Sequence, residues 1–594
     1  MVGKRSMRLI LPMSVLLCSL CALTQTQTSP NTAATPTFRA NSRLVQLDVI
    51  VLDGSGRPIR GLTDRDFTIF EDGKPQQLRS FDRHETSQAA PAVQEPFHLP
   101  PNQYTNVPVD EPRGPLTVVL FDTLNTPTLG QVEARRHLLE FLKTLPSGQS
   151  TALFVLSSRL RMVQSFTQQS DVLVAAARTV LSSPSPLLTT EAEHQRNEDD
   201  LIYRERMTAP TVIGGGSGTA AGAQAPNDSD LIAGTTARLR DALIMQEQYE
   251  ITQRVGITLR SLAELAAMLQ GYSGRKNLLW VSGTFPFSFG PNPFIRTQQH
   301  DRSNFDFVVH QTTSLLSAAQ VAVYPINAIG LQLNGIDLTS NGEGMTGYDA
   351  STGMARRNAG LARQMVDEND AQTTMDEIAE QTGGKAYYGT NGLKQAMQHS
   401  LDQTSTYYTV AYAPENQNWN GKFRRITVKT TRDGAGLQYR RGYYAIPEPQ
   451  HSPQDSTLKL AAVMRPDTPD STALYLKAEV LPPDADRHSV RITYLVNPQQ
   501  ITFTDAPEGR KHAFVDLLAV VWDRNGKDIG HSANTIDATF SNDEYQKVLR
   551  AGLQAAQEVP VKPGAYRVRI GAVDRLSQQV GTIDVLLPHD QKSN

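Results

Sequence analysis

Cysteine is nearly absent from this chain. Only two of its 594 residues are cysteines, Cys18 and Cys21, and both lie close to the N-terminus. The rest of the chain therefore has no disulfide framework, no paired-cysteine redox motif and no cysteine-based zinc site. Outside residues 9–23, no apolar run approaches the roughly 20 residues that a membrane-spanning helix needs, so the mature chain is predicted to have no transmembrane segment. The net charge is −3, which gives no reason to expect a nucleic-acid partner.

The familiar catalytic motifs are also missing. The sequence contains no Gly-x-Ser-x-Gly elbow and no His-Glu-x-x-His helix, and its twelve histidines are scattered. We therefore predict that the protein is not an enzyme and has no catalytic residues. A carboxylate-only hydrolase remains a weaker alternative, because no second acidic residue is predicted at a strand end.

The first 24 residues have the three parts of a secretory signal. Lys4, Arg5 and Arg8 precede an apolar segment at 9–23, and polar residues follow. This pattern predicts a signal peptide at 1–24 and a secreted or periplasmic protein. Lipid attachment at Cys18 or Cys21 stays open. Residues 25–40, rich in Thr, Ser, Pro and Ala, are predicted to be a linker.

Alternating apolar and polar residues predict strands on both sides of a central region. The first set spans 41–86, and a second set at 404–446 is expected to pair with it and complete one sandwich. Residues 456–594 alternate in the same way and predict a separate, immunoglobulin-like β-sandwich. Residues 87–114 and 447–455 are predicted to be linkers.

Residues 115–403 alternate between apolar strands and amphipathic helices. This order predicts an α/β domain with a doubly wound, mostly parallel sheet. Two polar stretches, 183–235 and 330–365, read as insertions. The glycines at 214–218 do not form a phosphate loop, because no strand precedes them and no lysine follows.

The segment at 116–122 carries the main candidate site. Its continuous apolar run is typical of a strand buried on both faces, and Asp122 ends that strand. Ligands of open α/β sheets bind beyond the carboxyl ends of the strands, so Asp122 is a candidate binding residue. The alternative is that Asp122 caps the helix that follows. Ser282 directly follows another predicted strand, at 277–281.

Two turns far apart in the chain are alike. Residues 51–59 and 521–529 share Val, Asp, Gly, a basic residue and Ile in register. We interpret both as the same hairpin turn, and a gene duplication remains possible.

A strand that ends in Asp122 and is followed directly by residues with hydroxyl side chains resembles the first strand and loop of the von Willebrand factor type A fold. The segments 67–75, 380–387 and 407–414 are similar to von Willebrand factor A-related proteins of Acidobacteria, so the resemblance covers about 41–446. It implies a metal-ion-dependent adhesion site of the form Asp-x-Ser-x-Ser for Mg²⁺ or another divalent cation.

This sequence departs from that motif. Asp122 and Thr126 match it, but Leu124 stands where the first serine is expected, and Ser282 stands where an aspartate is expected. Asn125, Thr123 and water could replace the missing ligands. The resemblance therefore implies a degenerate metal site made of Asp122, Asn125, Thr126 and Ser282.

We accordingly expect an exported, non-enzymatic binding or adhesion-type protein. The loops around Asp122 would face a protein or cell-envelope partner, with or without a bridging cation. The alternative is a structural protein of the cell envelope that binds no metal.

Overall fold

The computed structural model describes residues 43–85, 99–107, 115–146, 148–180, 228–285, 299–328, 371–388, 393–447, 453–465, 468, 470–483 and 488–588. The predicted signal peptide, the 25–40 linker, both cysteines and the stretches 183–227 and 330–365 lie outside these residues. Within the described ranges, no helix combines the length and the apolar character needed to cross a membrane.

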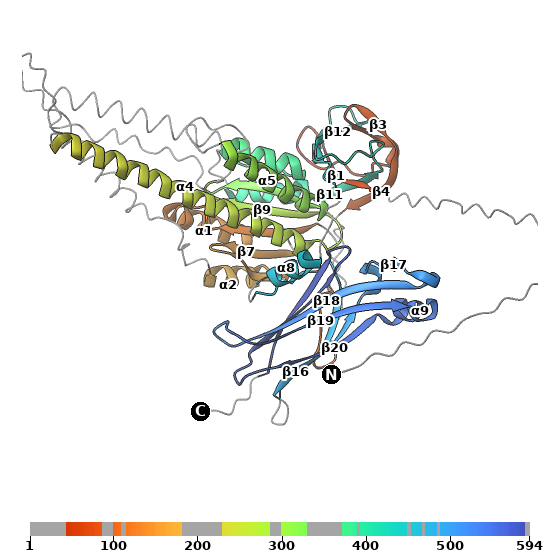
Figure 1. Cartoon of the computed structure of the whole chain (residues 1–594). Helices are drawn as coiled ribbons and strands as arrows, with labels where there is room; N and C mark the ends of the chain where they lie inside the picture. The colour runs from red at the N-terminus through yellow and green to blue at the C-terminus, as the bar shows by residue number, and fades with distance from the viewer. Residues whose placement is uncertain are drawn as a thin grey trace, which may run out of the picture. The chain divides into compact units, whose positions relative to one another are not determined.

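The central α/β domain is built on a five-stranded sheet (Figure 1). The sheet has the order β10-β9-β6-β7-β8, and only the edge strand β8 is antiparallel to its neighbour. Its strands are β6 (Leu116–Asp122), β7 (Thr151–Leu156), β8 (Leu160–Thr167), β9 (Lys276–Ser282) and β10 (Val321–Asn327). The predicted α/β class with a mostly parallel sheet is confirmed. Residues 383–387, expected to form a further strand, contribute a single bridge between Tyr387 and Ile326.

Helices cover both faces of this sheet. Side chains alternate along a strand, so Val118 and Leu120 pack in one core cluster while Val119 and Phe121 pack in the other. The first cluster includes residues of α4 (Asp228–Leu269) and α5 (Gln299–Ala318). The second includes residues of α1 (Thr128–Leu142), α2 (Ser170–Val180) and α7 (Leu393–Gln403). Because α4 begins at Asp228, residues 228–235, predicted as the end of the 183–235 insertion, are helical.

Strands from two distant parts of the chain pair with each other in the N-terminal sandwich. One sheet has the order β13-β1-β11-β4 and the other β14-β12-β2-β3, and β1 pairs with β11 while β2 pairs with β12. The early strands are β1 (Val45–Leu52), β2 (Phe67–Glu71), β3 (Lys74–Gln76) and β4 (Leu78–Glu85). The late strands are β11 (Thr406–Tyr412), β12 (Phe423–Thr430), β13 (Gly436–Gln438) and β14 (Gly442–Tyr444).

A buried ion pair lies inside this sandwich. Arg424 Nη1 is 3.3 Å from Glu71 Oε1, and both side chains are 3% exposed. The hydroxyls of Tyr412 and Tyr443 donate to the other oxygen of Glu71 at 2.7 and 2.9 Å. Arg424 also donates to two backbone carbonyls and lies over the Trp419 ring. Each polar group of the network is therefore paired, as burial of charge requires.

The C-terminal region forms two further sheets around one core. The first sheet contains β5 (Gln103–Thr105), β15 (Leu476–Leu481), β16 (Ser489–Val496) and β20 (Leu553–Pro560). The second contains β17 (Thr504–Asp505), β18 (Lys511–Trp522), β19 (Asp528–Phe540), β21 (Arg567–Asp574) and β22 (Val580–Leu586). Helices α8 (Pro453–Val463) and α9 (Asn542–Ala551) belong to the same part of the chain. Short 3-10 helices are η1 (Asp64–Asp66), η2 (Pro498–Gln500) and η3 (Pro507–Gly509).

Two of the predicted linkers contain secondary structure. Residues 103–105 of the 87–114 linker form β5, which pairs with β15, and residues 453–455 of the 447–455 linker begin α8. Both segments were expected to be irregular because they are short, polar and proline-containing. The pairing partner of β5 is more than 370 residues away in the chain, so no local pattern could indicate it.

The two similar turns have the same hydrogen bonds. Asp53 Oδ1 accepts the N–H groups of Ser55 and Arg57, each at 2.9 Å. Asp523 Oδ1 accepts the N–H groups of Asn525 and Lys527 at 2.8 and 2.9 Å. Gly56 and Gly526 both have positive φ angles, 79° and 75°. The interpretation of both segments as one type of hairpin turn is confirmed.

Asp470, in the C-terminal region, should make stability depend on pH. Burial raises the pKa of Asp470 to about 6, although Arg569 opposes the rise, and the charge of Asp584 adds to it. Between about pH 4 and this value the folded state holds a proton that the unfolded state releases, so stability should fall as the pH rises. The fall should stay below about tenfold in the folding equilibrium constant per pH unit, because the side chain is 36% exposed.

Thermal unfolding of wild type and Asp470→Asn between pH 4 and 7 measures this effect. The difference between the two proteins should change across the window, and Asp543→Asn, an exposed aspartate on α9, should follow the wild type. Parallel curves for wild type and Asp470→Asn would contradict the assignment.

Candidate functional site

The sheet topology brings the carboxyl ends of β6 and β9 together. The chain leaves β6 to form β7 and β8 on one side, and then returns to form β9 on the other side of β6. This reversal is a topological switch point, the place where open α/β sheets bind ligands. Asp122 is the last residue of β6 and Ser282 the last of β9. The two residues predicted to lie at strand ends therefore lie at the same edge of the sheet, on neighbouring strands.

The four predicted residues do lie together. We call Asp122, Asn125, Thr126 and Ser282 the Asp122 cluster. Asp122 Oδ1 accepts the backbone N–H of Asn125 at 2.9 Å. Asp122 Oδ2 accepts from Asn125 Nδ2 at 2.8 Å and lies 3.1 Å from the hydroxyl of Ser282, which also donates to the Thr284 carbonyl. The Asp122 side chain thus holds its own loop and the β9 loop in place.

Further hydrogen bonds join these two loops. The N–H of Gly283 donates to Thr126 Oγ1 at 2.8 Å, and Thr126 donates to the carbonyl of Asp122. Both the N–H and the hydroxyl of Thr284 donate to the carbonyl of Asn125 at 2.8 Å. Apart from Asn125 Oδ1, the side-chain oxygens of the cluster are therefore already used as hydrogen-bond partners inside the protein.

Two residues of this network were missed at the sequence level. Trp280 Nε1 donates to Asp122 Oδ2 at 3.0 Å, and Thr258 Oγ1, on α4, accepts from Asn125 Nδ2 at 2.9 Å. Trp280 lies two residues before Ser282, so the two side chains share one face of β9. That spacing was a usable signal for Trp280, whereas Thr258 had none because it is placed only by the packing of a long helix.

Burial dominates the electrostatics of the cluster. All four side chains are at most 1% exposed. Burial raises the pKa of Asp122, while the hydrogen bonds from Asn125, Trp280 and Ser282 oppose the rise. The expectation that these residues form an exposed surface for a partner disagrees with the structure, because all four side chains are buried.

The alternative role of Asp122 as a helix cap is also wrong. The residue before α1 is Pro127, which makes no side-chain capping bond. Asp122 instead accepts the N–H three residues ahead, within its own turn.

The donor set does not fit a hard divalent cation. Such an ion takes six or more oxygen ligands, but Asp122 Oδ2 already faces two N–H donors and a hydroxyl. Leu124 and Trp280 supply no oxygen ligand, and Asn125 Oδ1 is the one buried side-chain oxygen of the cluster left without a partner in the described residues. Across the described ranges, no group of three or more His, Cys, Asp or Glu side chains is placed to hold a metal.

Comparisons with known proteins add little. No protein-family model matches the sequence, and no curated protein matches it. Among solved structures, the chain is similar to the conserved hypothetical protein BatB from Bacteroides thetaiotaomicron, with 9% identity over 49% of this chain and 97% of that chain and a TM-score of 0.22. An aerotolerance-related membrane protein from Bacteroides fragilis has 11% identity over 49% and 98% of the two chains, with a TM-score of 0.23. TM-scores this low leave fold and function to be argued from the residues of this chain.

Proposed function

We propose that this chain is an exported, non-enzymatic scaffold of the cell envelope whose α/β domain is of the von Willebrand factor A type and works without a metal ion. The N-terminal signal pattern supports export. The domain type is supported by the doubly wound strand order with an antiparallel edge and by the Asp-containing loop at the switch point. These features favour the fold of that family without its ion chemistry.

One observation carries the proposal: the Asp122 carboxylate is enclosed and held by donors from its own loop and from β9. Those donors take the place in which a cation would sit, so the network keeps the loops in position without one. Among the described residues, no second carboxylate contacts Asp122, so these contacts add no support to the hydrolase alternative.

If the scaffold holds another protein, that partner would bind to a surface other than the Asp122 cluster. Helices α4 and α5 pack against each other, and each exposes large apolar side chains. Met245 and Tyr249 on α4 are 73% and 66% exposed, and Phe307 on α5 is 62% exposed. Exposed apolar groups of this size favour contact with a protein or envelope partner.

Capture from an envelope extract tests the proposal. Tagged full-length protein should retain the same partners in buffer with Mg²⁺ and in buffer with EDTA. The double variant Tyr249→Ser and Phe307→Ser should lose them, whereas the control Gln554→Ser, an exposed position on β20, should not. Loss of capture in EDTA would contradict metal independence. Unchanged capture by the double variant would place the interface elsewhere, and capture of no partner by the wild type would favour the purely structural role.

A further inference from the structure

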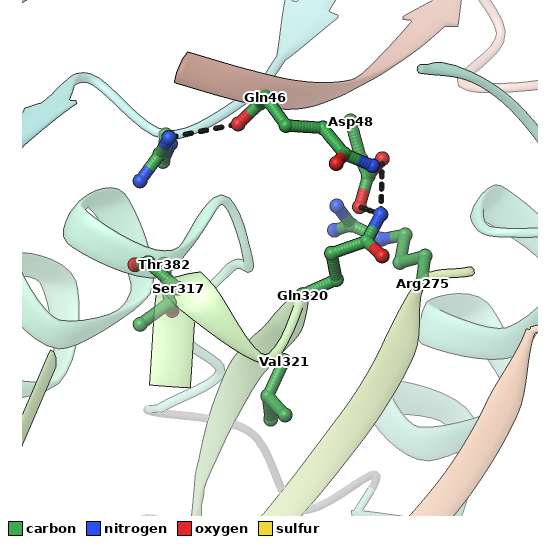
Figure 2. Close-up of a pocket in the computed structure, with 8 residues that line it drawn as sticks. Gln46, Asp48, Arg275, Ser317, Gln320, Val321 and Thr382 are labelled. Carbon is green, nitrogen blue, oxygen red and sulfur yellow. Dashed lines mark hydrogen bonds between the residues drawn. The ribbon is translucent and has the colours of Figure 1, made fainter. Parts of the chain in front are cut away.

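A small polar cavity is lined by residues of the N-terminal sandwich and by residues at the amino ends of β9 and β10. Figure 2 shows Gln46 and Asp48 of β1 facing Arg275, Gln320 and Thr382 across it. Arg440 also lines the cavity. The cavity has a volume of about 20 Å³, which is enough for one small ion or one water molecule.

Positive charge exceeds negative charge around this cavity. Arg275 and its neighbour Lys276 are 2% and 1% exposed. The charge of one carboxylate, Asp48, acts on Arg275, Lys276 and Arg440. Burial lowers the pKa of Lys276 to about 8, so this lysine is still mostly charged at neutral pH. Two arginines and one carboxylate therefore line the cavity, and Lys276, next to Arg275 in the chain, adds a further positive charge nearby.

Asp48 does not bond directly to the arginines. Its Oδ1 accepts from the Thr409 hydroxyl at 2.7 Å and from Gln320 Nε2 at 3.3 Å (Figure 2). Arg275 donates through Nη2 to the Tyr324 hydroxyl and the Gly383 carbonyl, and Arg440 donates through Nη2 to the Gln46 carbonyl. These neutral acceptors satisfy hydrogen bonds but leave the net charge uncompensated.

Each arginine also has an unused donor. The Nε–H groups of Arg275 and Arg440 are buried and have no hydrogen-bond partner among the described residues. Native proteins rarely leave buried donors unpaired, and a charged group raises the cost. Two unpaired guanidinium N–H groups beside a cavity therefore indicate a missing acceptor.

We propose that this cavity binds a small inorganic anion of about the size of chloride. An anion would accept hydrogen bonds from the unpaired N–H groups and offset the excess positive charge. A water molecule could accept these hydrogen bonds but would not offset the charge. The size of the cavity favours a monatomic ion over phosphate. The bound ion would link the N-terminal sandwich to the α/β domain, since its donors come from both.

Thermal unfolding of the full-length protein at constant ionic strength tests the site. Sodium chloride replaces sodium gluconate stepwise, and the unfolding temperature should rise with chloride to a plateau, by about 2–4 °C at tenfold saturation. The same series with sodium phosphate should give no plateau of this kind. A linear response to chloride, or a response to phosphate alone, would overturn the proposal.

Adjacent arginines supply the matched control. Arg440→Gln should abolish the chloride plateau, while Arg441→Gln should keep it, because Arg441 is 63% exposed and pairs with the exposed Glu380. Asp48→Asn should act in the opposite direction and lower the half-maximal chloride concentration by at least about tenfold, because Asp48 lines the cavity and its negative charge repels a bound anion at an effective dielectric constant of about 20. Equal chloride responses in all three variants would refute the site.

Crystals give a test that needs no variant. Wild-type crystals grown in bromide should show an anomalous peak within hydrogen-bond distance of Arg275 and Arg440. A cavity without that peak in a bromide-grown crystal would overturn the proposal even if chloride stabilises the protein.

Discussion

Replacing Asp122 with alanine should lower the free energy of unfolding of the α/β domain by about 3–5 kcal/mol. The substitution removes the acceptor for the backbone N–H of Asn125, for its amide nitrogen and for the Trp280 indole, all of which are buried. Unsatisfied buried donors cost about 1–3 kcal/mol each, and relief of the buried charge offsets part of the sum. Trp280 lies 3.0 Å from Asp122, so its fluorescence reports the unfolding directly.

Urea unfolding in a background that retains Trp280 as the single tryptophan, with Trp419→Phe and Trp522→Phe, measures the change. The control is Asp402→Ala, an exposed aspartate on α7 in the same domain, which should unfold at the wild-type midpoint. A loss smaller than about 1 kcal/mol for Asp122→Ala would mean that the network adds little to the fold.

Replacing Glu71 with alanine should destabilise the N-terminal sandwich by a similar amount, about 3–5 kcal/mol. The change leaves the Arg424 guanidinium buried without its carboxylate and removes the acceptor of the Tyr412 and Tyr443 hydroxyls. Hydrogen exchange followed by mass spectrometry can resolve this effect, since the amides of β12 should lose protection while those of β18 keep it.

Two comparison variants separate the buried charge from other causes. Glu380→Ala breaks the exposed pair with Arg441 and should leave β12 protected, because exposed ion pairs contribute little. Glu71→Leu combined with Arg424→Met removes both charges and should cost less than Glu71→Ala alone. A larger cost for the double variant would show that the hydrogen bonds of Arg424, rather than charge balance, stabilise the sandwich.

Long, regular patterns were predictable from the sequence, and short or distant ones were not. The strand at 116–122 has the predicted bounds, because a continuous apolar run has few other solutions. β20 was missed, because Leu553–Pro560 uses alanine and glutamine where a strand usually shows larger apolar residues. β5 is three residues long and is defined only by its partner β15.

The location of the candidate site was predictable, but its nature was not. Asp122 and Ser282 end strands that the topology places side by side, and that follows from the order of strands and helices. Whether the carboxylate faces solvent depends on side chains that arrive from elsewhere, above all Trp280 and Thr258. Trp280 sits in an apolar strand and looks like an ordinary core residue, so its N–H was not counted as a donor.

Calorimetric titration of the full-length wild type with Mg²⁺, and separately with Mn²⁺, tests the central claim most directly. The account predicts no saturable heat for either ion, since the hydrogen bonds of the Asp122 cluster occupy the oxygens that a cation would need. Saturable one-site binding that disappears in Asp122→Asn would contradict it and would restore the cluster as a metal site.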